Sequence, residues 1–524
     1  MRPVRLAAID LGTNSVHMVV ANVTPDGRIE VIDRVKEMVR LGRRAFTTGM
    51  LSAESMTMAG RALKTFGRLA RVRRVHRLRA VATSAVREAR NGERFVARLR
   101  RETGLPVQII SGPEEARLIF RATRHAFGLA GGPHLLVDVG GGSVELSLAR
   151  DGRPLWMRSL QLGVARLTQQ FLTKDPPSAS QVRALEEHLD HELDDLLDEV
   201  RRAGAVQAIG TSGTINTVVG MALAARGDDA PRLHGASASA DQVAWLRQRV
   251  LAHDAEERAE LPGMDAKRAD LMPASVILLD TILSRAGGLD LVACSWALRE
   301  GVLLDLAGVS SAQGPATPAG RRRSVQALAA RYAGTNAHGR HAAVLALQLY
   351  DALGADLGLP PAARELLEYA ALLHDIGHAI EHDRHHRHAF YLIRASELLG
   401  FSPVEIEVIA LAARGHRKQA PRLSDPEVQA LPPASRRVVR GIAALLRVAD
   451  ALDRTHFGAV KGVRVSRTRG RLAIVAETAG ESVELELWAA ERRVDLLSRL
   501  LDRPIAFRAT AARQVPERRI RAAR

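Results

Sequence analysis

Apolar and polar residues in the first part of the chain alternate between two patterns. Apolar runs of about four to eight residues predict strands, and longer stretches with an apolar residue every third or fourth position predict helices. The predicted strands are 4–10, 16–23, 29–35, 78–82 and 107–110. The predicted helices run from Ser52 to about Val72 and over 90–103. This mixture favours an α/β fold.

The same order of elements returns further along the chain. Strands are predicted at 134–139, 144–149 and 205–210, long helices at 179–203 and 239–252, and a last strand and helix within 290–306. Two stretches with the same order of strands and helices predict two related α/β domains.

Beyond residue 308 the pattern changes. Residues 309–323 lose periodicity and gather Gly, Pro and Ser, which is typical of a linker. Helices are then predicted at 341–353, 362–374 and 403–414, followed by a β-like stretch at 463–488, a helix at 489–501 and a basic tail. The predicted division is 1–132, 133–308, the linker 309–323, a helical domain over 324–456 and a C-terminal α/β extension over 457–524.

Two segments 128 residues apart are nearly the same. Residues 8–16 and 136–144 are each an apolar strand that ends near an Asp, a turn containing Gly that is closed by Ser, and a second apolar run. Each pair of strands is followed by another turn, at 26–28 and 151–153. The repetition predicts duplicated domains, each presenting a hairpin turn to a common cleft.

The chemistry of these turns favours phosphate over a plain hairpin, although hairpins need Gly as well. Glycine lets backbone N–H groups converge on an anion, and short side chains add hydrogen-bond donors. Asp10 and Asp138 stand where a carboxylate can hold a divalent cation that bridges phosphate oxygens. The candidate phosphate-binding residues of the two turns are Gly12, Thr13, Asn14, Ser15, Gly140, Gly141, Gly142 and Ser143.

Three other segments carry candidate chemistry. Glu114 and Glu115 open a helix, where a carboxylate either stabilises the first turn or accepts a proton from water. Arg87 follows a strand and either binds phosphate or lies on the surface. A third Gly-rich strand-to-helix turn suits an anion at a helix N-terminus, and its residues are Gly210, Thr211, Ser212, Gly213 and Thr214.

The amino-acid composition limits which partners and which cellular compartment we expect for this protein. A formal charge of +17 in 524 residues suits a long anionic substrate, but aromatic residues make up only 3%, so nucleic acid is not the expected partner. The single Cys294 excludes a disulfide framework and fits a reducing cytoplasm. No apolar run reaches the roughly 18 residues of a membrane span, so we expect a soluble cytoplasmic protein without membrane partners.

Five motifs, in order, resemble the exopolyphosphatase and guanosine pentaphosphate phosphohydrolase family. They are IDLGTNS (9–15), ATSAVR (82–87), SGPEEARL (111–118), DVGGGSVE (138–145) and GTSGT (210–214). The resemblance implies two actin-like domains, of the RNase H-like and sugar-kinase superfold, around a cleft. It implies that Glu115 is the catalytic base, that Asp138 and Glu145, with Asp10, hold Mg²⁺, and that Arg87 neutralises the terminal phosphate.

The helical region carries a second constellation. Six histidines lie between 374 and 388, and the pair His374-Asp375 with the distant Asp450 resembles the HD phosphohydrolase signature. His338 fits the upstream ligand position best, with His341 as its rival. Imidazole and carboxylate suit Mn, Fe or Zn, and His416 with one histidine of 385–388 would extend the site to two metals. The alternative is an inert, degenerate HD fold, which the family carries at this position.

The sequence therefore predicts an exopolyphosphatase that releases orthophosphate from polyphosphate ends. Guanosine pentaphosphate hydrolysis is the nearest alternative, because the motifs do not separate the two substrates. A non-catalytic sensor of polyanions or nucleotides and a phosphotransferase remain as further alternatives. A homodimer is compatible with the sequence, which does not decide the oligomeric state.

Overall fold

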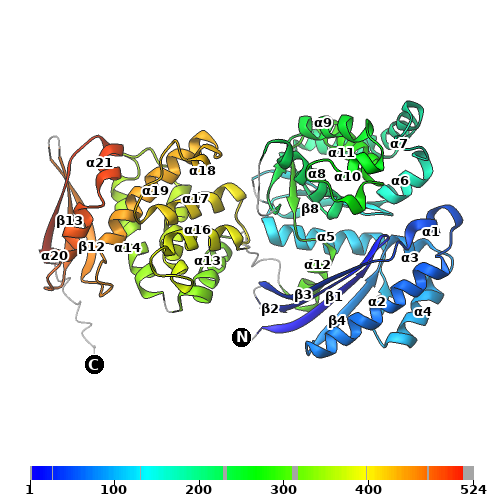
Figure 1. Ribbon diagram of the computed structural model, residues 1–524, viewed down its shortest axis with the longest axis horizontal. Helices are drawn as coiled ribbons and strands as arrows, with labels where there is room; N and C mark the ends of the chain where they lie inside the picture. Colours follow the sequence, from blue (N-terminus) through cyan, green and yellow to red (C-terminus); the bar gives the residue numbers. More distant parts are fainter. Residues whose placement is uncertain are drawn as a thin grey trace, which may run out of the picture. The chain divides into compact units, whose positions relative to one another are not determined.

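Two mixed β-sheets that share the same strand order form the first part of the molecule. The computed structural model describes residues 3–25, 27–129, 131–227, 233–309, 317–334, 336–396, 398–468 and 471–511. It divides into two units, Met1–Gly320 and Arg321–Arg524 (Figure 1). The strands of the first unit are β1 (Val4–Leu11), β2 (Ser15–Val23), β3 (Ile29–Met38), β4 (Arg77–Ala82), β5 (Val107–Ile109), β6 (Pro133–Val139), β7 (Val144–Arg150), β8 (Arg153–Leu160), β9 (Gln207–Thr211), β10 (Ser237–Ala238) and β11 (Leu291–Cys294).

The strand order confirms the duplication. The first sheet has the order β3-β2-β1-β4-β5, and the second has β8-β7-β6-β9-β11 with β10 added at its edge. In both, three antiparallel strands come first and parallel strands follow on the other side of the first strand. Asp10 pairs with His17 in the first sheet, as Asp138 pairs with Glu145 in the second. This is the predicted pair of actin-like domains.

Helices of the first unit cover both sheets. They are α1 (Gly42–Thr48), α2 (Ala53–Val72), α3 (Ser84–Glu88), α4 (Gly92–Thr103), α5 (Gly112–Phe127), α6 (Val164–Phe171), α7 (Ala179–Ala203), α8 (Gly213–Ala225), α9 (Ala240–Leu251), α10 (Ala255–Ala259), α11 (Met272–Arg285) and α12 (Leu298–Leu306), with a 3₁₀ turn at Ala266–Arg268. Helix α5 comes from the first repeat and packs on β7 and β8 of the second, whereas α12 packs on β1 and on α5. Figure 1 shows α5 running between the two sheets.

Helices with a local sequence signal, such as a capping residue or a polar face, could be predicted, and helices without one could not. Ser52 caps α2, because its hydroxyl accepts a hydrogen bond from the Ser55 N–H at 3.1 Å. Helix α11 was not predicted. Its residues are buried on nearly every side, so it lacks the polar face that gives a surface helix its period.

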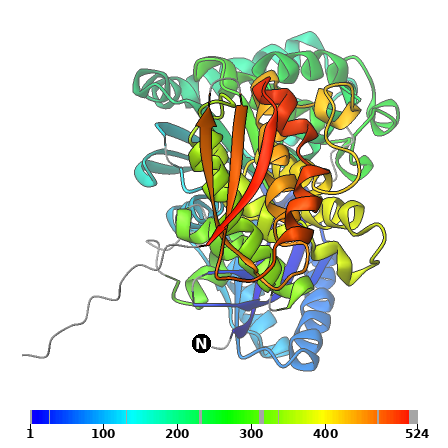
Figure 2. The same ribbon diagram turned by 90° about the vertical axis from the view of Figure 1, so that its left-hand side faces the viewer.

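The second unit is a helical bundle with a small sheet. Its helices are α13 (Pro318–Ala333), α14 (Ala337–Leu353), α15 (Ala362–Leu373), α16 (His385–Ala395), α17 (Pro403–Gly415), α18 (Pro426–Gln429), α19 (Pro433–Ala451), α20 (Glu484–Glu491) and α21 (Asp495–Leu501), with a 3₁₀ turn at Ile376–Ala379. The three strands, β12 (Val460–Thr468), β13 (Arg471–Thr478) and β14 (Ile505–Ala511), are ordered β12-β13-β14. Figure 2 shows this sheet face on. Apolar residues of helices and sheet form one continuous core.

Several sequence expectations differ from the structure here. The single helix expected at 489–501 is divided between α20 and α21. Residues 484–488, expected as β-like, begin α20, and β14 was not predicted because its residues alternate only weakly between apolar and polar. Residues 318–323, expected within the linker, already belong to α13, whereas 310–316 lie outside the described residues. The basic tail beyond 511 also lies outside them. Among the described helices, none is long and apolar enough to cross a membrane.

Candidate active site

Three carboxylates, one buried and two half-buried, lie at the ends of the central strands. Asp10 is the penultimate residue of β1, Asp138 holds the same position on β6, and Glu145 faces Asp138 across the hairpin. Burial raises the pKa of Asp10 to about 6, and burial with the neighbouring Glu115 raises the pKa of Glu145 well above its usual value. Asp10 Oδ1 and Glu145 Oε2 are buried without a hydrogen-bond partner. Such oxygens, collected at one place, suit a hard divalent cation.

Hydroxyl groups fix two of these carboxylates. Ser159 donates to Glu145 Oε1 at 2.7 Å, and Ser143 also hydrogen-bonds Glu145. Thr211, on the strand beside Asp138, donates to Asp138 Oδ1. Ser143 and Thr211 were predicted to bind phosphate. In this structure their hydroxyls hydrogen-bond Asp138 and Glu145, and phosphate binding by these residues stays a prediction.

The structure separates the two glutamates of the α5 N-terminus. Glu114 lies in a partly exposed ion network, where it pairs with Arg79 and Arg117. Glu115 is buried, and its Oε2 accepts a hydrogen bond from Arg87 at 2.8 Å. Arg87 also donates to the Ile110 carbonyl at 3.0 Å, so two contacts hold its guanidinium. Glu115 therefore has the environment of a reactive group and Glu114 that of a surface ion pair.

The protonation of Glu115 gives a testable pH profile. Burial raises the pKa of Glu115 to about 7, while the Arg87 cation lowers it. A base acts only when deprotonated, so kcat/KM should rise as pH increases through about 7. Arg87→Gln removes the cation and should move this rising limb to higher pH, whereas Glu114→Gln should leave it in place. A pH–rate profile unchanged by Arg87→Gln would contradict the pairing.

The Gly-rich turns of the two domains lie against each other. Each has the same backbone hydrogen bond, from Gly12 N to Ser15 O at 3.1 Å and from Gly140 N to Ser143 O at 3.0 Å. A Cβ on Gly141 would lie 2.9 Å from the Thr13 side chain. At this position close packing against the other domain requires glycine.

A chain of three residues beside the first turn orients a hydroxyl. Arg299, from the start of α12, lies with its guanidinium 2.5 Å from His17 Nδ1. Burial and this cation lower the pKa of His17 to about 2, so the imidazole is neutral. With Nδ1 accepting from Arg299, His17 Nε2–H donates to Ser15 Oγ at 2.7 Å. The Ser15 O–H is then free to donate to a ligand.

The third turn carries a strained backbone and a nearby cation. Ser212 caps α8 with φ +100°, a conformation that costs free energy for a residue other than glycine. The Arg268 guanidinium lies so close to Gly213 that a Cβ there would clash with it. A helix N-terminus and a guanidinium side by side both attract an anion.

A cavity of about 300 Å³ begins at the first turn, and the three carboxylates are not among the residues that line it. Asn14 and Ser15 line one end, and Arg268 belongs to its wall. Its basic residues are Lys36, Arg40, Arg43, Lys267 and Arg268, against the acidic Asp265 and Asp270. The described residues that line it include no aromatic side chain. The cavity is therefore suited to a flexible anion and offers no surface for stacking a base.

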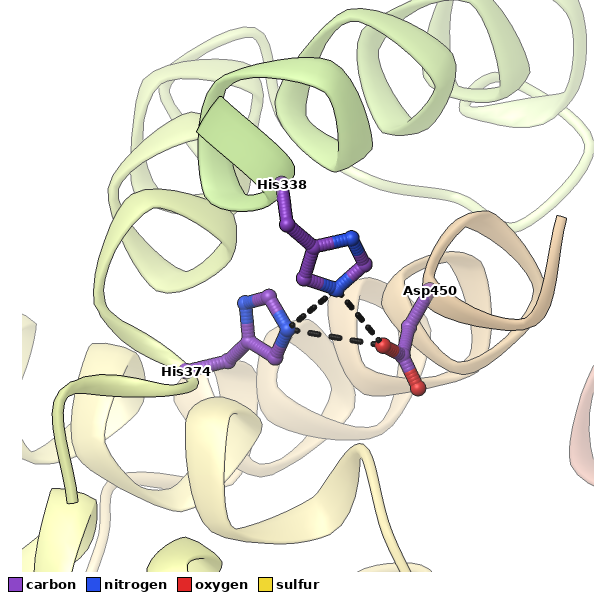
Figure 3. Close-up of side chains that lie close together, drawn as sticks. All are labelled: His338, His374 and Asp450. Atoms are coloured by element: carbon purple, nitrogen blue, oxygen red, sulfur yellow. Dashed lines mark hydrogen bonds and ion pairs between the residues drawn. The ribbon is translucent and has the colours of Figure 1, made fainter. Parts of the chain in front are cut away.

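The second predicted constellation also comes together, in the helical unit. His338 begins α14, His374 follows α15 and Asp450 lies near the end of α19 (Figure 3). His338 Nε2 lies 3.2 Å from Asp450 Oδ1 and 3.3 Å from His374 Nε2. Asp375 Oδ2 lies 3.8 Å from His338 Nε2. The rival His341 stays outside these groups, 4.0 Å from Asp453.

Sequence reasoning missed several of these residues. Arg299 and Arg268 are two among many arginines, and only their place in the fold distinguishes them. His17 could have been found as the counterpart of Glu145 in the repeat. Asp453 accepts a hydrogen bond from His338 Nδ1 at 2.7 Å, and its spacing of three from Asp450 on a helical turn was a usable signal.

The chain belongs to the Ppx/GppA phosphatase family. The model of that family matches residues 19–309, and the model of Ppx/GppA phosphatase domain III matches residues 321–479. The chain is accordingly a phosphoanhydride hydrolase.

Solved structures agree with this assignment. An exopolyphosphatase from Cytophaga hutchinsonii is 29% identical, with a TM-score of 0.55, and the match covers 59% of this chain and 99% of that one. The Ppx/GppA family member from Aquifex aeolicus is 29% identical, with a TM-score of 0.51, over 58% of this chain and 97% of that one.

Proposed function

We propose that this phosphatase is an exopolyphosphatase, which hydrolyses the terminal phosphoanhydride of inorganic polyphosphate. The basic cavity beside the first Gly-rich turn carries the proposal. Its cations match a chain of repeated phosphates, and its described lining offers no aromatic partner for guanine. Guanosine pentaphosphate is the alternative substrate, and an exopolyphosphatase among the similar structures supports polyphosphate.

The geometry supports a division of roles for hydrolysis. Glu115 would accept a proton from the attacking water. It is buried, and burial raises the pKa of its carboxyl group. Arg87, 2.8 Å from Glu115, would neutralise the terminal phosphate and keep the base oriented. Ser15, with its O–H released by His17, would donate to a phosphate oxygen, as would backbone groups of residues 140–142.

The carboxylates fit a divalent cation. Asp10 Oδ1 and Glu145 Oε2 are buried acceptors without donors, and Asp138 faces Glu145 across the hairpin. These three residues would hold Mg²⁺, which when bound supplies positive charge for the developing charge on the phosphoryl oxygens.

Charge in the cavity gives a direct test of the substrate. Lys36→Gln with Arg43→Gln should raise KM for long polyphosphate. The slope of log KM against log salt concentration should fall by roughly 0.7–0.9 for each phosphate that the cavity no longer neutralises. The matched control, Arg61→Gln with Lys64→Gln on the exposed face of α2, should change neither. The Lys36→Gln with Arg43→Gln variant should raise KM less for guanosine pentaphosphate than for long polyphosphate. Equal losses for both substrates would argue against polyphosphate as the preferred one.

A further inference from the structure

The Gly-rich turn of the second repeat is tied to the helix that follows it. The Val164 N–H, at the start of α6, donates to the Gly140 carbonyl at 3.1 Å. The Ala165 N–H donates to the Gly141 carbonyl at 2.9 Å. The first N–H groups of α6 are therefore used to hold two peptide planes of the turn.

A side chain holds the third peptide plane of the same turn. Arg166, also in the first turn of α6, donates from Nε to the Gly142 carbonyl at 3.1 Å. Its guanidinium carbon lies 4.2 Å from the centre of the Phe46 ring, and its side chain is only 9% exposed. Burial and stacking on Phe46 leave the guanidinium little freedom, so the direction of its Nε–H is fixed.

The direction of these three carbonyls fixes the direction of three N–H groups. In a planar trans peptide, the C=O and the N–H point in opposite directions. Because the carbonyls of residues 140–142 are held toward α6, the N–H groups of residues 141–143 point away from it. Among the residues that the structure describes, none accepts a hydrogen bond from these three N–H groups. Neighbouring backbone N–H groups that point to one side form a site for an anion.

The first repeat holds the corresponding turn without a side chain. The Asn14 carbonyl is the counterpart of the Gly142 carbonyl in the repeated sequence. It accepts hydrogen bonds from the backbone N–H groups of Val39 and Arg40, at 3.0 and 2.8 Å. In the second repeat, Arg166 therefore does with its side chain what backbone N–H groups do in the first.

Glu88 of the first repeat holds the other end of the Arg166 guanidinium. Its Oε2 accepts a hydrogen bond from Arg166 Nη2 at 2.5 Å, and its Oε1 accepts one from the Ser84 hydroxyl at 2.7 Å. Glu88 lies on α3 directly after Arg87, whose guanidinium contacts Glu115. One ion pair therefore connects the Gly-rich turn of the second repeat to the helix that carries Arg87 in the first.

We propose that Arg166 and Glu88 are positioning residues for phosphate release, which aim the N–H groups of residues 141–143 at the phosphoryl oxygens and hold that turn in place relative to Arg87. Arg166 acts through the Gly142 carbonyl and Glu88 acts through Arg166, so neither needs to contact the substrate. The proposal rests on the proposed phosphate-binding role of this turn. It applies to polyphosphate and to guanosine pentaphosphate alike.

Arg166→Gln tests this role, with Arg124→Gln as the matched control. Arg124 also lies near an aromatic ring and donates to a glycine carbonyl of the second repeat, that of Gly152 at 3.2 Å. Gly152 lies beyond the opposite end of β7 from the Gly-rich turn. We expect Arg166→Gln to lower kcat/KM by about 10–10²-fold, mostly in kcat, because a misdirected N–H no longer stabilises the charge that develops on the phosphoryl oxygens. Arg124→Gln should keep kcat/KM near that of the unmodified protein.

Arg166→Lys separates positioning from stability. Lysine keeps a cation for Glu88 but lacks the Nε donor that holds the Gly142 carbonyl. Its thermal unfolding should stay closer to that of the unmodified protein than the unfolding of Arg166→Gln does, whereas kcat should still fall by about tenfold or more. A purely structural role would lower stability and turnover together. Turnover of Arg166→Lys equal to that of the unmodified protein would overturn the proposal, even if Arg166→Gln did not fold.

Glu88→Gln tests the link between the two repeats. It keeps an oxygen that accepts from Arg166 but removes the charge, so we expect a smaller loss of kcat/KM than in Arg166→Gln. The double variant should lose no more than Arg166→Gln alone, because Glu88 acts through Arg166. Losses that multiply would overturn this link.

Every ratio is measured on whichever of the two substrates the unmodified protein hydrolyses faster. A preference for guanosine pentaphosphate would therefore contradict the proposed function and leave the comparison of Arg166→Gln with Arg124→Gln intact. Equal kcat/KM for these two variants, on the preferred substrate, would overturn the positioning role whatever that substrate is.

Discussion

Glu115→Gln should reduce kcat for phosphate release by about 10²–10⁴-fold, the usual contribution of a general base. The substitution keeps the size of a side chain that is buried and contacts Arg87, so the local packing should survive. The proton acceptor is lost, together with the negative charge that pairs with Arg87. Substrate binding, measured as KM or by displacement of a bound polyphosphate, should change little.

Glu114→Gln is the matched control for this substitution. It lies one residue away on the same helix turn, but its partners Arg79 and Arg117 form a partly exposed network. Exposed ion pairs contribute little, so its turnover should stay near that of the unmodified protein. If the two glutamine variants had equal activity, Glu115 would not be the base.

Asp138→Asn and Glu145→Gln should each lower the apparent affinity of the protein for Mg²⁺ by at least about tenfold. A neutral amide is a poorer ligand than a carboxylate for a hard cation. The measurement is phosphate release as a function of Mg²⁺ concentration, and excess Mg²⁺ should partly restore Asp138→Asn.

Ser159→Ala offers a milder comparison at the same place. Ser159 only orients Glu145, through a hydrogen bond of 2.7 Å, so its loss should raise the Mg²⁺ requirement less than Glu145→Gln does. Activity of Asp138→Asn and Glu145→Gln equal to that of the unmodified protein at limiting Mg²⁺ would place the cation elsewhere.

The duplicated fold could be predicted because its signal is local. Each hairpin has an Asp near the end of one strand and a Ser that closes the turn before the next, and the register Asp10–His17 and Asp138–Glu145 follows directly from it. Elements buried on all sides, such as α11, and short strands at a sheet edge, such as β10, give no such period. Their positions depend on tertiary packing.

The candidate site was predictable only where a motif carried it. Glu115 and Arg87 lie in separate motifs, and their contact appears only when α5 meets α3 beside the ends of the strands. Arg299 contacts His17 from 282 positions away, a distance at which no local pattern relates two residues. Ser143 and Thr211 were predicted to bind phosphate from their places in Gly-rich turns, and a local motif does not show that each also donates a hydrogen bond to a carboxylate.

One measurement tests the central claim most directly: orthophosphate release by the purified protein from long polyphosphate and from guanosine pentaphosphate, side by side, with Mg²⁺. We predict that release from both substrates requires Glu115 and that kcat/KM is higher for polyphosphate. Release from polyphosphate that persists in Glu115→Gln, or a higher kcat/KM for guanosine pentaphosphate, would contradict the proposed exopolyphosphatase.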